Sequence, residues 1–174
     1  MGVRSVMKDA GKAVVKAMGS EPDPTEQDLL DTLKREHDEV KDLLDNLQEA
    51  NTAAQRRALV QKIKMALVPH TKAEEKILYA AIIALKDNDA QVDGHEGYLE
   101  HECAARTLQR LGAISNVTSS EHKAAGKVLK ELVEHHIREE ENNVWGDAKK
   151  HFSDEDRVAM NQRYLAAKAR VKVS

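Results

Sequence analysis

The stretch His70-Thr71-Lys72-Ala73-Glu74-Glu75 decides the fold of this 174-residue chain, because its pattern returns 66 residues later as His136-Ile137-Arg138-Glu139-Glu140-Glu141. Each copy is followed at equivalent positions by an aliphatic and an aromatic residue, Leu78-Tyr79 and Val144-Trp145. Upstream, Glu36-His37 returns as Glu100-His101 at an offset of 64 residues. The chain is therefore predicted to be an internal repeat of a helical hairpin, with one His and then a His-x3-Glu pair in each half.

Each histidine of the repeat falls on the apolar face of a predicted helix. Apolar residues recur at spacings of three and four, the period of one helix face. The histidines occupy positions within these stripes, which are 30-33-37-40-44-47, 63-67-70-74-77, 101-104-108-111 and 129-133-136-140-144. Glu74 and Glu140 share their faces with the histidines four residues before them. Because buried ionisable groups are costly unless they are paired or bind a metal, this arrangement predicts a metal site.

Composition favours an all-α fold. The chain is 41% hydrophobic and 33% charged, and only 3% of its residues are aromatic. Abundant Ala, Leu, Lys and Glu favour helices over strands. We predict an up-and-down antiparallel four-helix bundle with extra N-terminal and C-terminal helices. Residues 1–24 are interpreted as a basic amphipathic segment and linker, residues 25–152 as the bundle, starting at a capping box on Thr25, and residues 153–174 as a short C-terminal helix.

Several classes of protein are disfavoured by the sequence. The longest apolar run, residues 77–85, is far shorter than the roughly 20 residues that span a bilayer. A single cysteine, Cys103, excludes an internal disulfide framework and fits a reducing compartment, so we expect a cytoplasmic protein. The net charge of −3 gives no argument for nucleic-acid binding. The chain has no phosphate-cradling glycine loop, nucleophile elbow or Cys-x2-Cys pair, so hydrolase and nucleotide-binding functions have no support.

Over about residues 26–152, this pattern resembles the hemerythrin-like, or HHE cation-binding, family. Members of that family hold a non-haem di-iron centre inside a four-helix bundle, so the resemblance implies two oxo- or hydroxo-bridged iron ions per chain. Carried over position by position, it implies terminal iron ligands at His37, His70, His101 and His136, and bridging carboxylates at Glu74 and Glu140. Imidazole and carboxylate donors suit iron, with manganese as the runner-up, whereas structural zinc sites favour thiolates.

The sequence departs from the oxygen-carrying hemerythrins in one respect. Those proteins have a His-x3-His pair on the third helix, but Gly97 stands four residues before His101 and Ala105 four residues after it. The further ligand is left open between Tyr98 and a water molecule. With fewer protein ligands, we expect the centre to react with O2, peroxide or nitric oxide, for example in peroxide disproportionation or slow oxidase activity, rather than to store O2 reversibly.

Other candidate residues are given structural roles. Tyr79 and Trp145 are expected in the core. Glu75, Glu139 and Glu141 are expected to face water or to hydrogen-bond the imidazoles from outside. Surface positions near helix ends are expected for three further histidines, His95, His122 and His151.

Residues 1–20 carry a basic stripe, with Arg4, Lys8, Lys12 and Lys16 one helical turn apart. This stripe is interpreted either as an accessory helix or frayed terminus, or as an amphipathic helix with a weak contact to a membrane surface or a protein. The alternatives to a redox protein are therefore a sensor of O2, NO or iron that signals through this helix, and an iron-handling protein. The expected partner is a small diatomic or peroxide molecule, with no nucleic acid, and the oligomeric state is left open.

Overall fold

The computed structural model describes residues 23–173, most of which lie in helices. In chain order the elements are the 3-10 turn η1 (Pro24–Glu26), α1 (Leu29–Glu49), α2 (Ala53–Glu74), the π-helical turn η2 (Glu75–Tyr79), α3 (Ala80–Ile83), α4 (Asn88–Ala113), α5 (Ser120–Glu139), the π-helical turn η3 (Glu140–Val144), α6 (Trp145–His151) and α7 (Asp154–Lys168). No strand occurs in this part of the chain, so the all-helical prediction is confirmed there. The basic stripe predicted in residues 1–20 lies outside the described residues.

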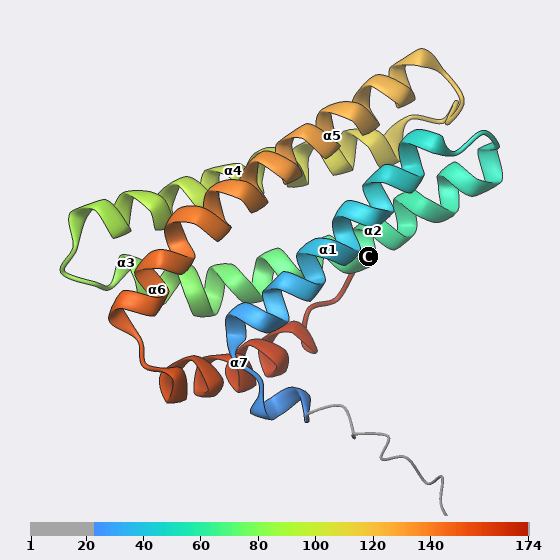
Figure 1. Cartoon of the computed structure of the whole chain (residues 1–174). Helices are drawn as coiled ribbons and strands as arrows, with labels where there is room; N and C mark the ends of the chain where they lie inside the picture. Colours follow the sequence, from blue (N-terminus) through green and yellow to red (C-terminus); the bar gives the residue numbers. More distant parts are fainter. Residues whose placement is uncertain (1–22, 174) are drawn as a thin grey trace, which may run out of the picture.

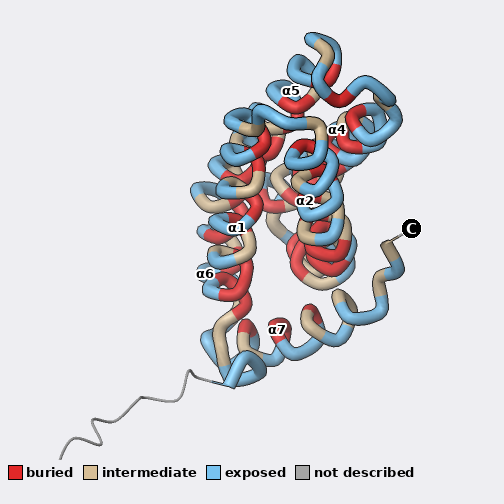
Figure 2. Tube along the Cα trace, turned by 90° about the vertical axis from the view of Figure 1, so that its right-hand side faces the viewer, coloured by how far each residue is buried: buried red, intermediate tan, exposed pale blue. Residues whose placement is uncertain are grey.

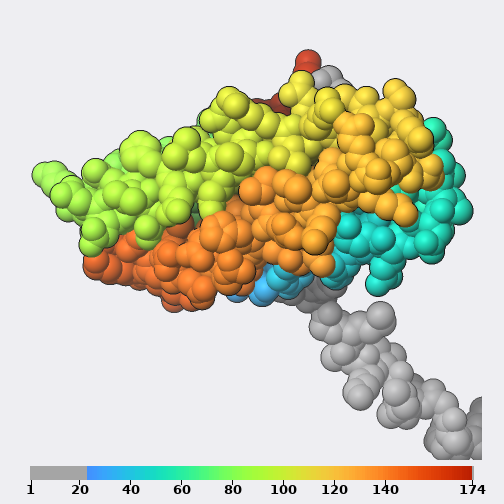
Figure 3. Space-filling view, turned by 90° about the horizontal axis from the view of Figure 1, so that it is seen from above, coloured from blue at the N-terminus to red at the C-terminus, as the bar shows by residue number. Residues whose placement is uncertain are grey.

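Four long helical segments run side by side (Figure 1): α1, α2 with its continuation into α3, α4, and α5 with its continuation into α6. Helix α1 packs against α2 and α5, and α4 packs against α5. Seen from above, α4 in green to yellow and the α5–α6 segment in orange form one face of the molecule (Figure 3). Short connections at 50–52, 84–87 and 114–119 join consecutive segments, an arrangement that suits a helical bundle.

Side-chain caps set where the helices begin. The first helix starts at Leu29 rather than at Thr25 as predicted, because the Asp28 side chain accepts a hydrogen bond from the Leu30 amide at 2.8 Å and acts as its N-cap. The residues before it form η1, in which Asp23 accepts from the Thr25 amide. The predicted capping box on Thr25 is therefore wrong. Reciprocal capping boxes do occur at the starts of α2 and α7, each satisfying amide groups that a helix start leaves unpaired.

Two apolar clusters fill the interior and leave a polar layer between them. The first cluster includes Leu33, Ala73 and Val144, and the second includes Val40, Leu67, Ala104 and Val133. On each long segment a histidine of the repeat lies close in sequence to both clusters; His37, for example, lies between Leu33 and Val40. The buried residues face inward on all four segments (Figure 2). The core thus fixes the level at which the histidines lie.

Helix α7 crosses one end of the bundle and packs against α1 and α2. Two of its buried side chains tie it to the start of α1. Arg157 donates to Asp28 at 2.7 Å, and the Asn161 amide donates to the carbonyls of Pro24 and Gln27 at 2.8 and 3.0 Å. The C-terminal segment is therefore joined to the bundle. Among the helices of residues 23–173, none is both long enough and apolar enough to cross a lipid bilayer.

Candidate metal centre

The six residues predicted as metal ligands meet at one level of the bundle, between the two apolar clusters. None of them is more than 6% exposed. They are His37 from α1, His70 and Glu74 from α2, His101 from α4, His136 from α5 and Glu140 from the first position of η3. Donor atoms of five of these residues form two groups compact enough to hold a metal ion: His37, His70 and Glu74 in one, and Glu74, His101 and His136 in the other.

Each buried carboxylate faces one histidine from each half of the repeat. Glu74 Oε2 lies 3.4 Å from Nε2 of both His70 and His101. Glu140 Oε2 lies 3.3 Å from His37 Nε2 and 3.5 Å from His136 Nε2. Two donors that each lie about 2.1 Å from one ion are about 3 Å apart when they bind at right angles. The observed spacings therefore suit donor atoms that share a metal ion, with both carboxylates between the two halves.

These carboxylates lack the partners that burial normally demands. Both oxygens of Glu74 and Oε2 of Glu140 are buried without a hydrogen bond in the described part of the chain, as is His37 Nε2. Burial and the neighbouring Glu140 carboxylate raise the pKa of Glu74 well above its usual range. Burial acts on Glu140 in the same direction, but the adjacent imidazoles of His136 and His37 outweigh it and lower the Glu140 pKa. A divalent cation would compensate both groups, so these residues fit a bound metal.

A glutamate faces the outer edge of each imidazole. The distances from Nδ1 to the carboxylate are 3.1 Å for His37 and Glu141, 3.0 Å for His70 and Glu36, 3.4 Å for His101 and Glu75, and 2.7 Å for His136 and Glu100. The contacts of His37, His70 and His136 are hydrogen bonds. Because an ionised carboxylate only accepts, it holds the proton of the neutral ring on Nδ1 and leaves the Nε2 lone pair facing the centre. All four rings are therefore oriented as metal ligands are.

The imidazoles differ in how readily they give up a proton. Burial lowers the pKa of His101 to about 4, so this ring is neutral at pH 7. Burial would also lower the pKa of His136, but Glu100 and Glu140 outweigh it and raise that pKa to about 9. A metal that binds His136 must therefore displace a proton, which makes binding at this position depend on pH.

Two of the four outer glutamates were expected from the sequence and two were missed. Glu75 and Glu141 were expected to bond the imidazoles from outside, whereas no such role was predicted for Glu36 or Glu100. The repeat does indicate a role for Glu36 and Glu100, because each of them directly precedes a histidine of the site. Glu139, the third glutamate considered for this role, contacts Asn143 and Arg138 rather than one of the four imidazoles.

Helix α7 supplies two side chains that contact the outer glutamate Glu36, which the sequence pattern did not indicate. The Tyr164 hydroxyl donates to Glu36 at 2.6 Å and lies 3.1 Å from His70 Nδ1, while Lys168 pairs with the same carboxylate at 2.6 Å. Burial opposes ionisation of Glu36, but His70, Lys168 and Tyr164 outweigh it and lower the Glu36 pKa to about 2. The C-terminal helix thus keeps Glu36 charged and holds it against His70.

Both long segments that carry a His-x3-Glu pair change to π-helical bonding at the glutamate. The turn η2 begins directly after Glu74, and η3 begins at Glu140. Such turns insert one extra residue into a helix and occur frequently at functional sites. A π turn brings residue i+5 close to residue i, so the aromatic residues at Glu74+5 and Glu140+5 reach the centre. Trp145 stacks on His37, with ring centroids 5.7 Å apart, and its Nε1 donates to Glu140 at 3.4 Å.

Tyr79, not Tyr98, lies beside the position where the oxygen-carrying hemerythrins have a further histidine. The Tyr98 hydroxyl donates to the Glu75 carbonyl at 2.5 Å, on the π turn and away from the imidazoles. A Cβ atom at Gly97 would lie 2.6 Å from the Tyr79 ring, so the absence of a side chain there makes room for this phenol. The Tyr79 hydroxyl lies 3.4 Å from His136 Nε2. Tyr79 is a core residue, as expected, and it also faces the centre.

The remaining histidines lie away from the centre. His122 is only 1% exposed, so its predicted surface position is wrong. Its Nδ1 accepts from the buried guanidinium of Arg56 at 3.3 Å, and Arg56 also donates to the carbonyls of Leu47 and Ala50. The start of α5 thus packs on the start of α2, which a single-helix pattern does not reveal. His151 pairs with Asp87 at 3.2 Å.

The fold and the site together define a helical protein with a buried cluster of His and Glu residues that could hold metal. The chain belongs to the hemerythrin HHE cation-binding domain family, whose sequence profile matches residues 28–148. It is also 26% identical, over 175 aligned residues, to a DNA nickase of Nostoc sp. strain PCC 7120. That alignment covers 98% of this chain but 49% of the Nostoc protein, so the chain spans about half the length of that relative. No solved structure matches the chain significantly.

The contact between Tyr164 and Glu36 predicts a measurable effect on metal affinity. Substitution Tyr164→Phe removes the hydroxyl that positions Glu36 on His70, and the loss of such a group next to a ligand commonly weakens metal binding about 10- to 100-fold. Competition for ferrous ion against a chromophoric chelator measures this affinity. The matched control is Tyr98→Phe, whose hydroxyl bonds a backbone carbonyl. Equal affinities of the two variants would contradict a role for α7 in the centre.

Proposed function

We propose that this protein is a non-haem di-iron protein that reacts with O2, peroxide or nitric oxide. One iron ion would bind His37 and His70, the other would bind His101 and His136, and Glu74 and Glu140 would join them. The observation that carries this proposal is the position of each buried carboxylate oxygen between two Nε2 atoms from opposite halves of the repeat. Manganese is the runner-up, because the same nitrogen and oxygen donors suit it.

We infer that the chain runs up and down through an antiparallel bundle. This topology is supported by the short connections between consecutive long segments and by the contacts of α1 with α2 and of α4 with α5. It would bring the two His-x3-Glu pairs of the repeat to the same level from opposite sides of the bundle.

The iron centre would supply the redox chemistry, and the surrounding residues would control access and protons. The apolar clusters on both sides exclude bulk water from the six ligands. Hydrogen bonds to Glu141, Glu36 and Glu100 hold three of the imidazoles in one tautomer. Burial and the carboxylates of Glu140 and Glu74 raise the Tyr79 pKa well above its usual range, so the hydroxyl keeps its proton. We infer that it donates a hydrogen bond to a small molecule bound at the centre.

The first test of this function is metal content. Protein purified from iron-replete cells is expected to contain two iron ions per chain and to absorb in the near ultraviolet. A double variant, Glu74→Ala with Glu140→Ala, should lose both properties because it lacks the two joining carboxylates. The matched control, Glu49→Ala with Glu131→Ala, changes two exposed glutamates by the same charge. Zinc retained in the absence of both buried glutamates would refute a di-iron centre.

A second test concerns Tyr79. In Tyr79→Phe the iron content should stay at two per chain, whereas peroxide consumption should fall about 100-fold, the usual scale for losing a positioned hydrogen-bond donor. Iron analysis and oxygen evolution from peroxide measure the two quantities on one sample, with Tyr98→Phe as the control. An unchanged rate would exclude Tyr79 as a hydrogen-bond donor to the bound molecule. Loss of iron would instead give its hydroxyl a role in holding metal.

In contrast to the activity named for the Nostoc nickase, we propose that nucleic acid is not a substrate of this chain. Support comes from charge: residues 21–174 carry six more acidic than basic side chains, and carboxylates surround the opening next to His136, so phosphates would be repelled.

An assay with supercoiled plasmid tests this last proposal. Metal-loaded protein should nick the plasmid no faster than the Glu74→Ala, Glu140→Ala variant incubated with the same total iron. This comparison separates the protein's own activity from cleavage by free iron. Faster nicking by the unsubstituted protein would contradict the proposal and would favour the activity named for the Nostoc relative.

A further inference from the structure

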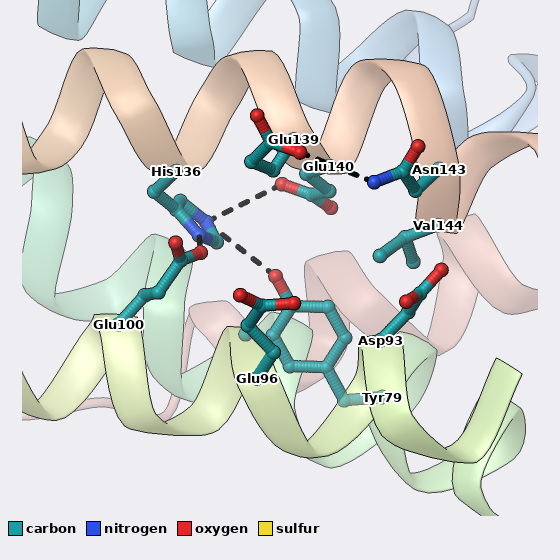
Figure 4. Close-up of a pocket in the computed structure, with 10 residues that line it drawn as sticks. Tyr79, Asp93, Glu96, Glu100, His136, Glu139, Glu140, Asn143 and Val144 are labelled. Atoms are coloured by element: carbon teal, nitrogen blue, oxygen red, sulfur yellow. Dashed lines mark hydrogen bonds and ion pairs between the residues drawn. The ribbon is translucent and has the colours of Figure 1, made fainter. Parts of the chain in front are cut away.

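A small opening between α4 and η3 leads from the surface to the candidate metal centre (Figure 4). Its volume is about 10 Å³, which is room for a single water molecule or ion. Tyr79 lies at its inner side, while His136 and Glu140 approach from one wall. The other wall is formed by α4, where Gly97 leaves space.

Carboxylates line this opening from the surface to its inner end. Glu96 is exposed, Asp93 and Glu139 are half-buried, and Glu140 is 2% exposed. Oε2 of Glu140, the innermost carboxylate oxygen, has no hydrogen bond in the described residues. The series therefore ends at a buried anionic oxygen that belongs to the candidate centre.

Two carboxylates near the mouth, Asp93 and Glu96, lack cationic partners among the described residues, whereas Glu139 lies 3.7 Å from Arg138 Nε. Within residues 23–173, no Lys or Arg lies within ion-pair distance of Asp93 or Glu96. Burial, together with the charges of Asp147, Glu96, Asp89 and Glu139, raises the Asp93 pKa. The negative charges thus reinforce one another at the mouth, and a narrow cleft with low-dielectric walls focuses such a field.

Elsewhere around the centre, lysines neutralise the outer glutamates. Glu36 pairs with Lys168 at 2.6 Å, Glu75 with Lys72 at 2.8 Å and Glu141 with Lys34 at 3.4 Å. Glu100, the outer glutamate that lines the opening, pairs with His135 and His136 and with neither a lysine nor an arginine among the described residues. Glu100 is therefore the one outer glutamate that lines this opening, and among the described residues it has no permanently charged partner.

We propose that this acidic opening, formed by Asp93, Glu96, Glu100 and Glu139, is the route by which a divalent metal cation reaches Glu140 and the buried histidines. The mouth attracts the cation, and each deeper carboxylate offers it an oxygen as its water shell is removed. The same charges disfavour anions. This inference rests on the proposed function, because it assumes that metal binds at the six central residues.

The experiment measures the uptake of ferrous ion by metal-free protein without oxygen. Samples are quenched with chelator at set times, and the iron retained per chain is counted. The test variant is Asp93→Asn with Glu96→Gln, which removes two charges at the mouth without touching the central residues. The control is Asp42→Asn with Glu49→Gln, a matched change at exposed positions of α1. Circular dichroism checks that both variants fold.

At low ionic strength the test variant should take up iron at least about 10-fold more slowly than the control, and both should reach the same final iron content. The difference should shrink in about 0.5 M salt, since salt screens the mouth. Equal uptake rates would overturn the route while leaving the centre intact. A lower final content in the test variant would overturn it too, since these residues would then hold metal rather than guide it. Unsubstituted protein that retains no iron would refute the centre itself, and the route with it.

Discussion

The burial of two carboxylates between apolar clusters is the constraint on which the rest of this structure depends. Glu74 and Glu140 are at most 2% exposed and stand where two like charges would repel each other. Around them lie four imidazoles, then four glutamates, and then lysines that pair with three of those glutamates. The polar groups thus form successive layers around the centre. Each layer makes the burial of the next one inward less costly, and a divalent cation would complete the series at the centre.

Helix geometry alone predicts that the six central side chains face inward, and all six are buried. Residues four apart share a face, so a His-x3-Glu pair within an apolar stripe must point inward, and the repeat brings two such pairs to one level. Glu36 and Glu100 were missed, although each directly precedes a histidine of the site in its own half of the repeat. The spacing of residues within one helix is sufficient to predict which side chains face inward wherever that helix stays regular.

Prediction fails where hydrogen bonding or tertiary contact changes the pattern. The π turns after the two His-x3-Glu pairs insert a residue and rotate everything that follows on the same segment. For this reason Tyr79 faces the centre, and Tyr98 satisfies a carbonyl of the π turn instead. The contacts of Tyr164 and Lys168 with Glu36 span more than 120 residues of sequence, and no periodicity within one helix encodes them. His122 was misplaced for the same reason, because its partner Arg56 belongs to another helix.

The two halves of the repeat are alike in their central residues and unlike in what surrounds them. Helix α7 covers the first half, where Tyr164 and Lys168 bind and neutralise Glu36. The second half has no equivalent helix in the described part of the chain, and there Glu100 lies beside a carboxylate-lined opening. The two halves of the centre thus have different surroundings. The first half is covered by α7, and the second half lies beside an opening lined by negatively charged side chains. Because a duplicated hairpin by itself would give both sides the same environment, this asymmetry has to come from residues outside the pattern, namely α7 and the acidic side chains of α4.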